Sequence, residues 1–345
     1  MNIPLRLSHT IKQYNLCEAI FINYSVLADK RRLRFDTCVY SSALWLLFCA
    51  VFALCLILFP EVCTNALRNA LTLLFHDLIP SIFPFITLNA LFSSSGGIES
   101  AARLLGRVFS RLFKTSGNLC APFLIGLISG FPSGAESAAE VYMRSGCNKT
   151  EAERALAFCT NAGPAFVIAG LGGMLGDIGY GALIYVVQIL SAFITARLFG
   201  SRSASDIPMP DIPRKGNASF VGSVTGSVIP MLNICAFVLI FSPIAALTDI
   251  GLSRLGAPAI IRGFALSLIE LTNASAFITA NLPMSLALPL CSFAVCWSGL
   301  CVHAQTSAAV ADSRLSLKFY LAGKLFSAIT AFLLTRIALI LTSWC

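Results

Sequence analysis

Two stretches in the middle of the chain decide the fold: Ser129-Gly130-Phe131-Pro132-Ser133-Gly134-Ala135-Glu136 and Thr160-Asn161-Ala162-Gly163-Pro164-Ala165-Phe166. Each combines Gly and Pro, which interrupt regular helices, with polar side chains. Apolar sequence flanks both stretches. Because lipid cannot hydrogen-bond free N–H and C=O groups, broken backbone at membrane depth must lie inside protein or beside a water-filled cavity. Secondary transporters place their solute sites at such discontinuous segments, so the sequence predicts a polytopic membrane protein with a central site.

The composition supports this class of protein. Of 345 residues, 57% are hydrophobic and 12% are charged, about half the charged share of a soluble domain. The formal net charge of +8 comes from basic residues in short loops, as the positive-inside bias predicts, so we expect a lipid bilayer and no nucleic acid as partner. The 13 cysteines include no Cys-x-x-Cys pair, and we expect no metal site and no cofactor.

The order of apolar segments predicts an all-α fold with about seven transmembrane helices and two re-entrant hairpins in two inverted repeats. Ser81-Ile82-Phe83-Pro84-Phe85 and Ser227-Val228-Ile229-Pro230-Met231 begin matching spans of the two repeats. The basic run before the first span places the N-terminus of a multi-pass cell-membrane protein in the cytoplasm. The expected parts are an N-terminal extension (1–37), a first transmembrane helix (38–60), repeat 1 (61–200), a linker (201–217) and repeat 2 (218–345).

Within the repeats, several segments are too short or too polar to cross a membrane. We expect an interfacial helix over 61–77 before a Pro-interrupted span over 78–95, and a second amphipathic arm over 249–262. Residues 119–128 are too few for a bilayer of about 30 Å, so they predict one limb of a hairpin whose tip is 129–134. The counterpart hairpin is expected over 263–281, followed by a span over 286–301.

The first hairpin tip supplies one group of candidate site residues: Gly130, Pro132, Ser133 and Gly134. A helix that begins at Ser133 would point free N–H groups at the tip and favour an anionic group there. The alternative is a structural turn. Glu136 and Glu140 are ion-coupling candidates, although Ser133-x-x-Glu136 also fits a capping box.

A second group of candidates lies further along the chain. Glu270 is isolated in an apolar stretch, where carboxylates are costly and usually functional; the alternative is an internal pair with an Arg or with backbone. The further solute-binding candidates are Asn161, Gly163, Pro164, Thr272, Asn273 and Ser298, with interhelical hydrogen bonding as the alternative for the polar ones. Glu270, His303 and Gln305 are ion-coupling candidates, although a lone His is more often structural.

Three motifs together resemble a known family: residues 130–135, Asn161-Ala162-Gly163-Pro164, and the run from Ser298 to Gln305. The chain resembles the YlbJ-type sporulation integral membrane proteins, also called SpoVV, within the nucleoside-recognition or Gate domain superfamily. Gate domains also occur in concentrative nucleoside transporters and in the membrane half of FeoB iron transporters. The resemblance implies a transporter-like protein of endospore formers, with dipicolinate as one candidate solute.

We therefore expect a secondary transporter or permease for a small polar or anionic solute, coupled to H⁺ or Na⁺. The alternatives are a non-transporting scaffold for spore envelope assembly, and a nucleoside or ion permease outside sporulation. The sequence carries neither His-Glu-x-x-His nor Gly-x-Ser-x-Gly, and we expect no enzymatic activity. A homo-oligomer is an open alternative to a monomer.

Overall fold

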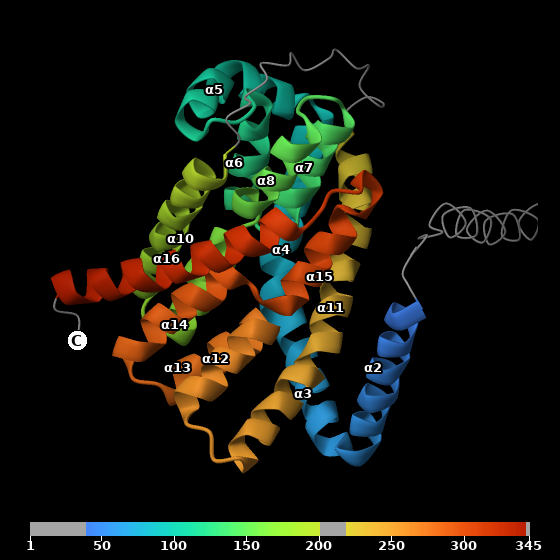
Figure 1. Cartoon of the computed structure of the whole chain (residues 1–345), viewed down its shortest axis with the longest axis vertical. Coiled ribbons are helices and arrows are strands. Elements are labelled where there is room, and N and C mark those ends of the chain that lie inside the picture. Colours follow the sequence, from blue (N-terminus) through green and yellow to red (C-terminus); the bar gives the residue numbers. More distant parts are fainter. Residues whose placement is uncertain (1–38, 201–218, 343–345) are drawn as a thin grey trace, which may run out of the picture. The chain divides into compact units, whose positions relative to one another are not determined.

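The computed structural model describes residues 39–200 and 219–342, and every regular element in these ranges is a helix (Figure 1). The all-α fold expected from the sequence is therefore confirmed. The expected N-terminal extension and the linker 201–217 lie outside the described residues. The chain divides into two compact units, residues 1–59 and residues 60–345, which are described separately.

The first unit contributes one described helix, α2 (Val39–Leu58), which has 20 residues and no charged side chain. A helix of this length rises about 30 Å, the thickness of the hydrocarbon core of a bilayer. Leu46, Leu47 and Ile57 are exposed on it. Its length and composition suit a helix that faces lipid.

The second unit begins with a helix that runs without interruption through α3 (Pro60–Leu73), η1 (Leu74–Leu78) and α4 (Ile79–Ser94). The expected boundary between an interfacial helix over 61–77 and a span over 78–95 lies within this continuous helix, at its π-helical turn. η1 is a π-helical turn directly before Pro80, which stands in the first two positions of α4. Because proline has no N–H to donate, the wider turn ahead of it allows the helix to continue rather than end.

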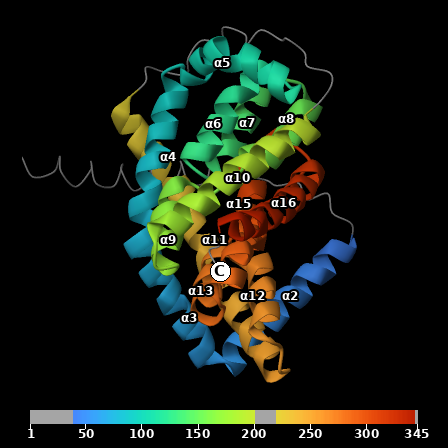
Figure 2. The same cartoon turned by 90° about the vertical axis from the view of Figure 1, so that its left-hand side faces the viewer.

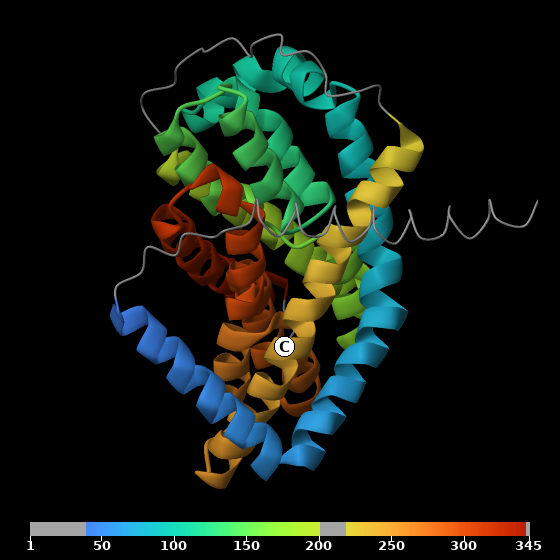
Figure 3. The same cartoon turned by 90° about the vertical axis from the view of Figure 1, so that its right-hand side faces the viewer.

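A second long helix, α11 (Phe220–Arg254), packs along both α3 and α4 (Figures 1 and 3). The expected arm over 249–262 is wrong, because α11 continues to Arg254 and the next helix begins at Ala259. Asp249 and Arg262 face each other across the connecting turn. The carboxylate of Asp249 accepts hydrogen bonds from Nε and Nη2 of Arg262 at 2.8 and 2.9 Å, which fixes the direction of the turn.

Two helical hairpins follow the long helices. α5 (Gly97–Phe113) and the short turn η2 (Gly117–Leu119) lead into hairpin 1, which consists of α6 (Cys120–Ile128) and α7 (Ser133–Met143). Hairpin 2 consists of α12 (Ala259–Ile269) and α13 (Leu271–Asn281). The two limbs pack against each other in both hairpins. Each limb has at most 11 residues, too few to cross a hydrocarbon core of about 30 Å.

Each hairpin is followed by a broken helix and then by a long helix. The elements are α8 (Lys149–Cys159), η3 (Ala165–Leu171), α9 (Gly172–Met174) and α10 (Ile178–Phe199), and in the second half α14 (Met284–Trp297), α15 (Gly299–Ala309), η4 (Ala311–Ser313) and α16 (Lys318–Thr342). α10 packs against α8 and α16 (Figure 2), and also against α14. The expected end of the span 286–301 is wrong, because the chain breaks at Ser298 and α15 continues to Ala309.

Two apolar clusters form most of the core. One gathers aromatic side chains of α5, α6 and α8, including Phe109, Phe113, Phe123 and Phe158. The other joins α10, α13, α14 and α16 around small side chains such as Ala287, Ala294 and Ala328. Small side chains allow helices in membranes to approach closely. This close packing holds the helices together, because lipid provides no hydrophobic force between them.

Among the described residues, four segments are long and apolar enough to cross a membrane: 178–199, 220–254, 284–309 and 318–341. Shorter apolar helices accompany them, including 117–128 and 259–269. The chain is therefore a polytopic integral membrane protein.

Candidate functional site

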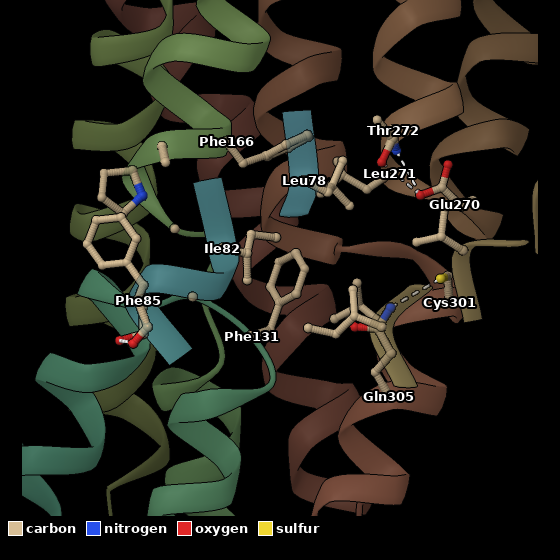
Figure 4. A pocket seen from close by; sticks show the side chains of 18 of the residues that line it. Leu78, Ile82, Phe85, Phe131, Phe166, Glu270, Leu271, Thr272, Cys301 and Gln305 are labelled. Atoms are coloured by element: carbon tan, nitrogen blue, oxygen red, sulfur yellow. Dashed lines mark hydrogen bonds between the residues drawn. The ribbon is translucent and has the colours of Figure 1, made fainter. Parts of the chain in front are cut away.

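A cavity of about 40 Å³ lies in the second unit where both hairpin tips, the break after α8, the helix α15 and both long helices meet (Figure 4). A volume of this size holds a few water molecules. Six separate stretches of chain line it: Leu78, Ile82 and Phe85 of the first long helix; Ile128 to Phe131 of hairpin 1; Gly163 to Phe166 after α8; Ile234 and Val238 of α11; Glu270 to Thr272 of hairpin 2; and Cys301, Val302 and Gln305 of α15.

The tip of hairpin 1 touches the break that follows α8. Gly130 has φ +81°, and a side chain added to it would come within 2.8 Å of the backbone nitrogen of Gly163. Only glycine combines this backbone conformation with so close an approach. The next peptide bond, Phe131–Pro132, is cis. Gly130 and Gly163 were both predicted as site residues, and the structure brings them together at the cavity.

The tip of hairpin 2 touches the break between α14 and α15 in the same way. Gly299 has φ +78°, and an added side chain would lie 2.9 Å from the carbonyl oxygen of Ile269 and 3.1 Å from the nitrogen of Glu270. Ser298 before it is also left-handed, with φ 74°. In both halves of the second unit, then, a glycine lets a hairpin tip pack directly on a helix break.

The carboxylate of Glu270 caps the N-terminus of α13. Its Oε1 accepts from the backbone N–H and the hydroxyl of Thr272, each at 3.0 Å, and its Oε2 accepts from the backbone N–H and the side-chain amide of Asn273 at 2.7 and 2.8 Å. The Asn273 amide also donates to Ser242 on α11. Glu270 is 3% exposed. Glu270 was interpreted either as a functional carboxylate or as one paired internally with an Arg or with backbone. The observed contacts are of the second kind, with backbone, and the residue also lines the cavity.

Gln305 presents a free acceptor in the buried wall of the cavity (Figure 4). Its Nε2 lies 3.4 Å from the sulfur of Cys301 on the same helix. Its Oε1 accepts no hydrogen bond from the described residues, although the residue is only 4% exposed. A buried acceptor without a partner is costly, so this position favours a ligand or water that donates a hydrogen bond.

The lining combines this acceptor with one carboxylate and an apolar surface. Among the described lining residues, Glu270 has the only ionisable side chain apart from the Cys301 thiol, and none is basic. The rings of Phe85, Phe131 and Phe166 come from three different elements (Figure 4). Together they can bind a flat apolar face, while Glu270 and Gln305 can accept hydrogen bonds.

Side chains from distant helices hold the extended stretch between α8 and η3. Gln188 on α10 accepts from the N–H of Ala162 at 3.1 Å and donates to its carbonyl at 2.9 Å. Lys324 on α16 donates to the carbonyl of Thr160 at 2.9 Å. Both side chains are at most 2% exposed. These two side chains form hydrogen bonds with backbone groups that lipid cannot satisfy, so the helix can be broken here.

A buried polar cluster lies beside these contacts, on α15 and α16. His303 Nδ1 is 2.8 Å from the hydroxyl of Tyr320, which is also 3.3 Å from the hydroxyl of Thr306. Trp297 packs edge-on against the His303 ring. His303 Nε2 has no hydrogen-bond partner among the described residues.

The structure gathers some of the predicted site residues and separates others. Gly130, Gly163, Pro164, Glu270, Thr272 and Gln305 line the cavity. The remaining predicted residues are not part of its lining: Pro132, Ser133, Gly134, Asn161, Asn273, Ser298, Glu136, Glu140 and His303. Asn161 donates to the carbonyl of Phe158, and the Ser298 hydroxyl donates to that of Val295.

Glu136 and Glu140 lie on α7, one helical turn apart. Burial raises the pKa of the Glu136 carboxyl, and the negative charge of Glu140 adds a smaller shift in the same direction. Burial raises the pKa of Glu140 although the nearby Arg144 opposes the shift. Arg144 also pairs with Glu99 of α5. The capping-box interpretation of Ser133 and Glu136 is wrong, because α7 follows Pro132 without a side-chain cap.

Reasoning from the sequence missed the aromatic rings of the cavity and the two side chains that hold the first break. Phe131 and Phe166 flank predicted residues within the quoted motifs, so their position beside a helix break was a usable signal. Gln188 and Lys324 are single polar residues inside apolar spans. That feature is itself the signal of function in a membrane protein.

The fold and the cavity define an integral membrane protein with a central site made from broken helices. Residues 75–181 match the family model described as Gate, nucleoside recognition. The sporulation integral membrane protein YlbJ of Bacillus subtilis (strain 168) is 22% identical over 311 residues, which cover 79% of this chain and 76% of that protein. No solved structure matches the chain. These findings confirm the resemblance expected from the sequence.

Proposed function

We propose that the protein is a secondary transporter or permease of the Gate type, and that the cavity is its solute site. The observation that carries the proposal is the origin of the lining: two hairpin tips, the break after α8, the helix α15 that follows the second break, and two long helices converge on one buried space. Broken helices that meet near the middle of a bundle are the architecture in which transporters bind solutes. The expectation that the chain has no enzymatic activity stays a prediction.

The order of elements supports two inverted repeats. Each half of the second unit contains a long helix, a hairpin, a broken helix and a closing long helix, in the same order. With the N-terminus in the cytoplasm, the two halves cross in opposite directions, and the two hairpins enter from opposite sides. Alternating access would then come from movement of one repeat against the other.

The chemistry of the lining favours a small, flat solute that carries hydrogen-bond donors. Phe131 and Phe166 provide apolar faces, and Glu270 and Gln305 provide acceptors. A nucleoside or nucleobase has this combination. A dianion such as dipicolinate would meet the carboxylate of Glu270 without a basic residue in the lining, so it would need a bound cation as well. A cavity of about 40 Å³ requires the surrounding elements to move apart before either solute enters.

The test is binding to the purified full chain, read as a change in thermal stability. Uridine, adenine, dipicolinate and Na⁺ are added separately, with pH steps. A ligand at 100 times its dissociation constant stabilises the folded state by about 2.7 kcal/mol. We expect stabilisation by uridine or adenine that is lost in Phe131→Ala and Glu270→Gln. Glu61→Gln, at an exposed position on α3, is the matched control and should keep the response.

Uptake by liposomes that contain the protein decides between transport and binding alone. Uptake of the stabilising solute, lost in the same two variants, supports the transporter. If dipicolinate alone stabilised the protein, the cavity would remain the proposed solute site, but the proposed solute would change to a dianion. A protein that responds to none of these compounds and takes up none would favour the alternative, a membrane scaffold in spore envelope assembly.

A further inference from the structure

Lys324 has a position that the solute cavity does not explain. It is 2% exposed inside the last long helix, and its Nζ lies 2.9 Å from the carbonyl oxygen of Thr160. Thr160 ends α8, where the last carbonyls have no partner within the helix and the helix dipole is negative. An ammonium group supplies both the donor and the charge that this end requires. Pro164 of the cavity lining lies four residues further along.

No carboxylate balances the charge of Lys324 among the described ion pairs. Titratable groups on the helices packed around it include Tyr320 on α16 itself, Cys296 on α14 and Cys159 on α8, and His303 on α15 contacts Tyr320. The charged residues of α8 lie nearer the start of that helix. α10 brings the uncharged Gln188 and Thr195. Buried charges in proteins are normally paired. A lysine surrounded by neutral and titratable groups instead can exist with or without its proton, because its amine changes state readily when buried.

A second titratable group, His303, is linked to α16 through Tyr320. Tyr320 is one helical turn before Lys324 on α16, so both side chains lie on one face. The Tyr320 hydroxyl is 2.8 Å from His303 Nδ1. Nε2 of His303 is buried without a partner among the described residues. The charge of Lys324 also acts on His303 and on Cys296, so the state of one group influences the others.

We propose that Lys324 is a proton-binding site that controls the break between α8 and η3. With the proton on Lys324, the ammonium group holds the Thr160 carbonyl by a charge-assisted hydrogen bond, about twice as strong as a neutral one. When Lys324 gives that proton to water, its neutral amine holds the carbonyl weakly and no other covalent bond changes. The break, and the cavity wall at Gly163 and Pro164, can then move. The role of this site rests on the proposed transport function, in which the proton would be the coupling ion.

The experiment follows the proton on Lys324 directly. The full chain is labelled with ¹⁵N-lysine, placed in lipid nanodiscs, and studied by solid-state NMR at a series of pH values at which circular dichroism shows an intact fold. Ammonium and amine nitrogens give separate signals. Lys324→Met removes and so assigns one signal. Lys318→Met, at the exposed first residue of the same helix, is the matched control.

We expect the Lys324 signal to move from the ammonium to the amine position while the fold is intact, with a midpoint that shifts in His303→Gln. The Lys318 signal should not shift its midpoint in that variant. If Lys324→Met does not fold, a through-space correlation between Nζ and the Thr160 carbonyl carbon assigns the signal in the unaltered chain. A Lys324 signal that keeps one form until unfolding overturns the proposal and leaves a fixed helix cap. Because the proton is the only ligand added, this result is independent of whether any solute binds.

Discussion

The two helix breaks beside the cavity satisfy their backbone groups in different ways. At the first break, the extended residues after α8 depend on side chains from distant helices: Gln188 on α10 and Lys324 on α16. At the second, the break is confined to two left-handed residues, Ser298 and Gly299, and the chain continues as helix. The adjoining hairpin tip is capped locally, by Glu270 and residues directly after it.

This difference indicates which part of the site is coupled to the rest of the fold. A local cap moves with its own helix, so hairpin 2 can shift and keep the hydrogen bonds that Glu270 makes at its tip. The first break cannot move relative to α10 and α16 without loss of remote hydrogen bonds. Movement there must be accompanied by a change at Gln188 or Lys324. The first break is therefore the place where occupancy of the cavity and the state of other helices can influence each other.

The largest expected effect is at the remote contacts of the first break. Gln188→Leu leaves the N–H and the carbonyl of Ala162 buried without partners, each at a cost of about 1–3 kcal/mol. We expect a loss of about 2–6 kcal/mol in the free energy of unfolding, measured by chemical denaturation in a mild detergent.

The control for Gln188→Leu is Ser191→Ala on the same helix. Ser191 is fully buried, but its hydroxyl has no partner among the described residues, so its loss should leave stability nearly unchanged. Equal effects of the two substitutions would show that the first break does not depend on Gln188, and the contrast between the breaks would be lost.

At the second break, the expected effect comes from close packing. Gly299→Ala forces a left-handed residue to carry a side chain, at about 1–2 kcal/mol, and places that side chain 2.9 Å from the Ile269 carbonyl. Gly256 has φ +74° and no atom within 4 Å of an added side chain, so Gly256→Ala measures the conformational cost alone. We expect Gly299→Ala to lower the thermal midpoint clearly more than Gly256→Ala. Equal shifts would mean that the contact with hairpin 2 is loose.

Much of this contrast could be predicted from the sequence, because it depends on residues with a strong local signal. Gly130, Gly163 and Pro164 interrupt an apolar sequence, and Glu270 is a charge within one; each was placed at the site and each lines the cavity. The first hairpin was expected from a segment too short to cross a bilayer, and the second from polar residues within the corresponding apolar stretch 263–281.

The remainder depends on tertiary contacts that local patterns do not encode. Lys324 is 164 residues from the carbonyl that it contacts, and Gln188 is 26 residues from Ala162. Helix ends were misplaced for a related reason. Pro80, Pro84 and Pro230 indicated interruptions, but a π-helical turn and packing between the two long helices keep those helices continuous. Tertiary packing there outweighs the local tendency of proline to end a helix.

The smallest expected effect is at the start of α8, the helix whose other end forms the first break. Asn148 and Glu151 form a capping box there: the Asn148 side chain accepts from the Glu151 N–H at 2.9 Å, and the Glu151 carboxylate accepts from the Asn148 N–H at 3.1 Å. Asn148→Ala should cost about 1 kcal/mol. Thr150-x-x-Glu153 fits the same sequence pattern, but Thr150 is exposed and within the helix, so Thr150→Ala should leave the unfolding midpoint unchanged. α8 would then be stabilised in two ways: a local cap has a modest effect at its start, and remote contacts have a larger effect at its end. If Asn148→Ala cost as much as Gln188→Leu, local capping would stabilise α8 as strongly as remote contacts do, and the first break would have no special link to α10 and α16.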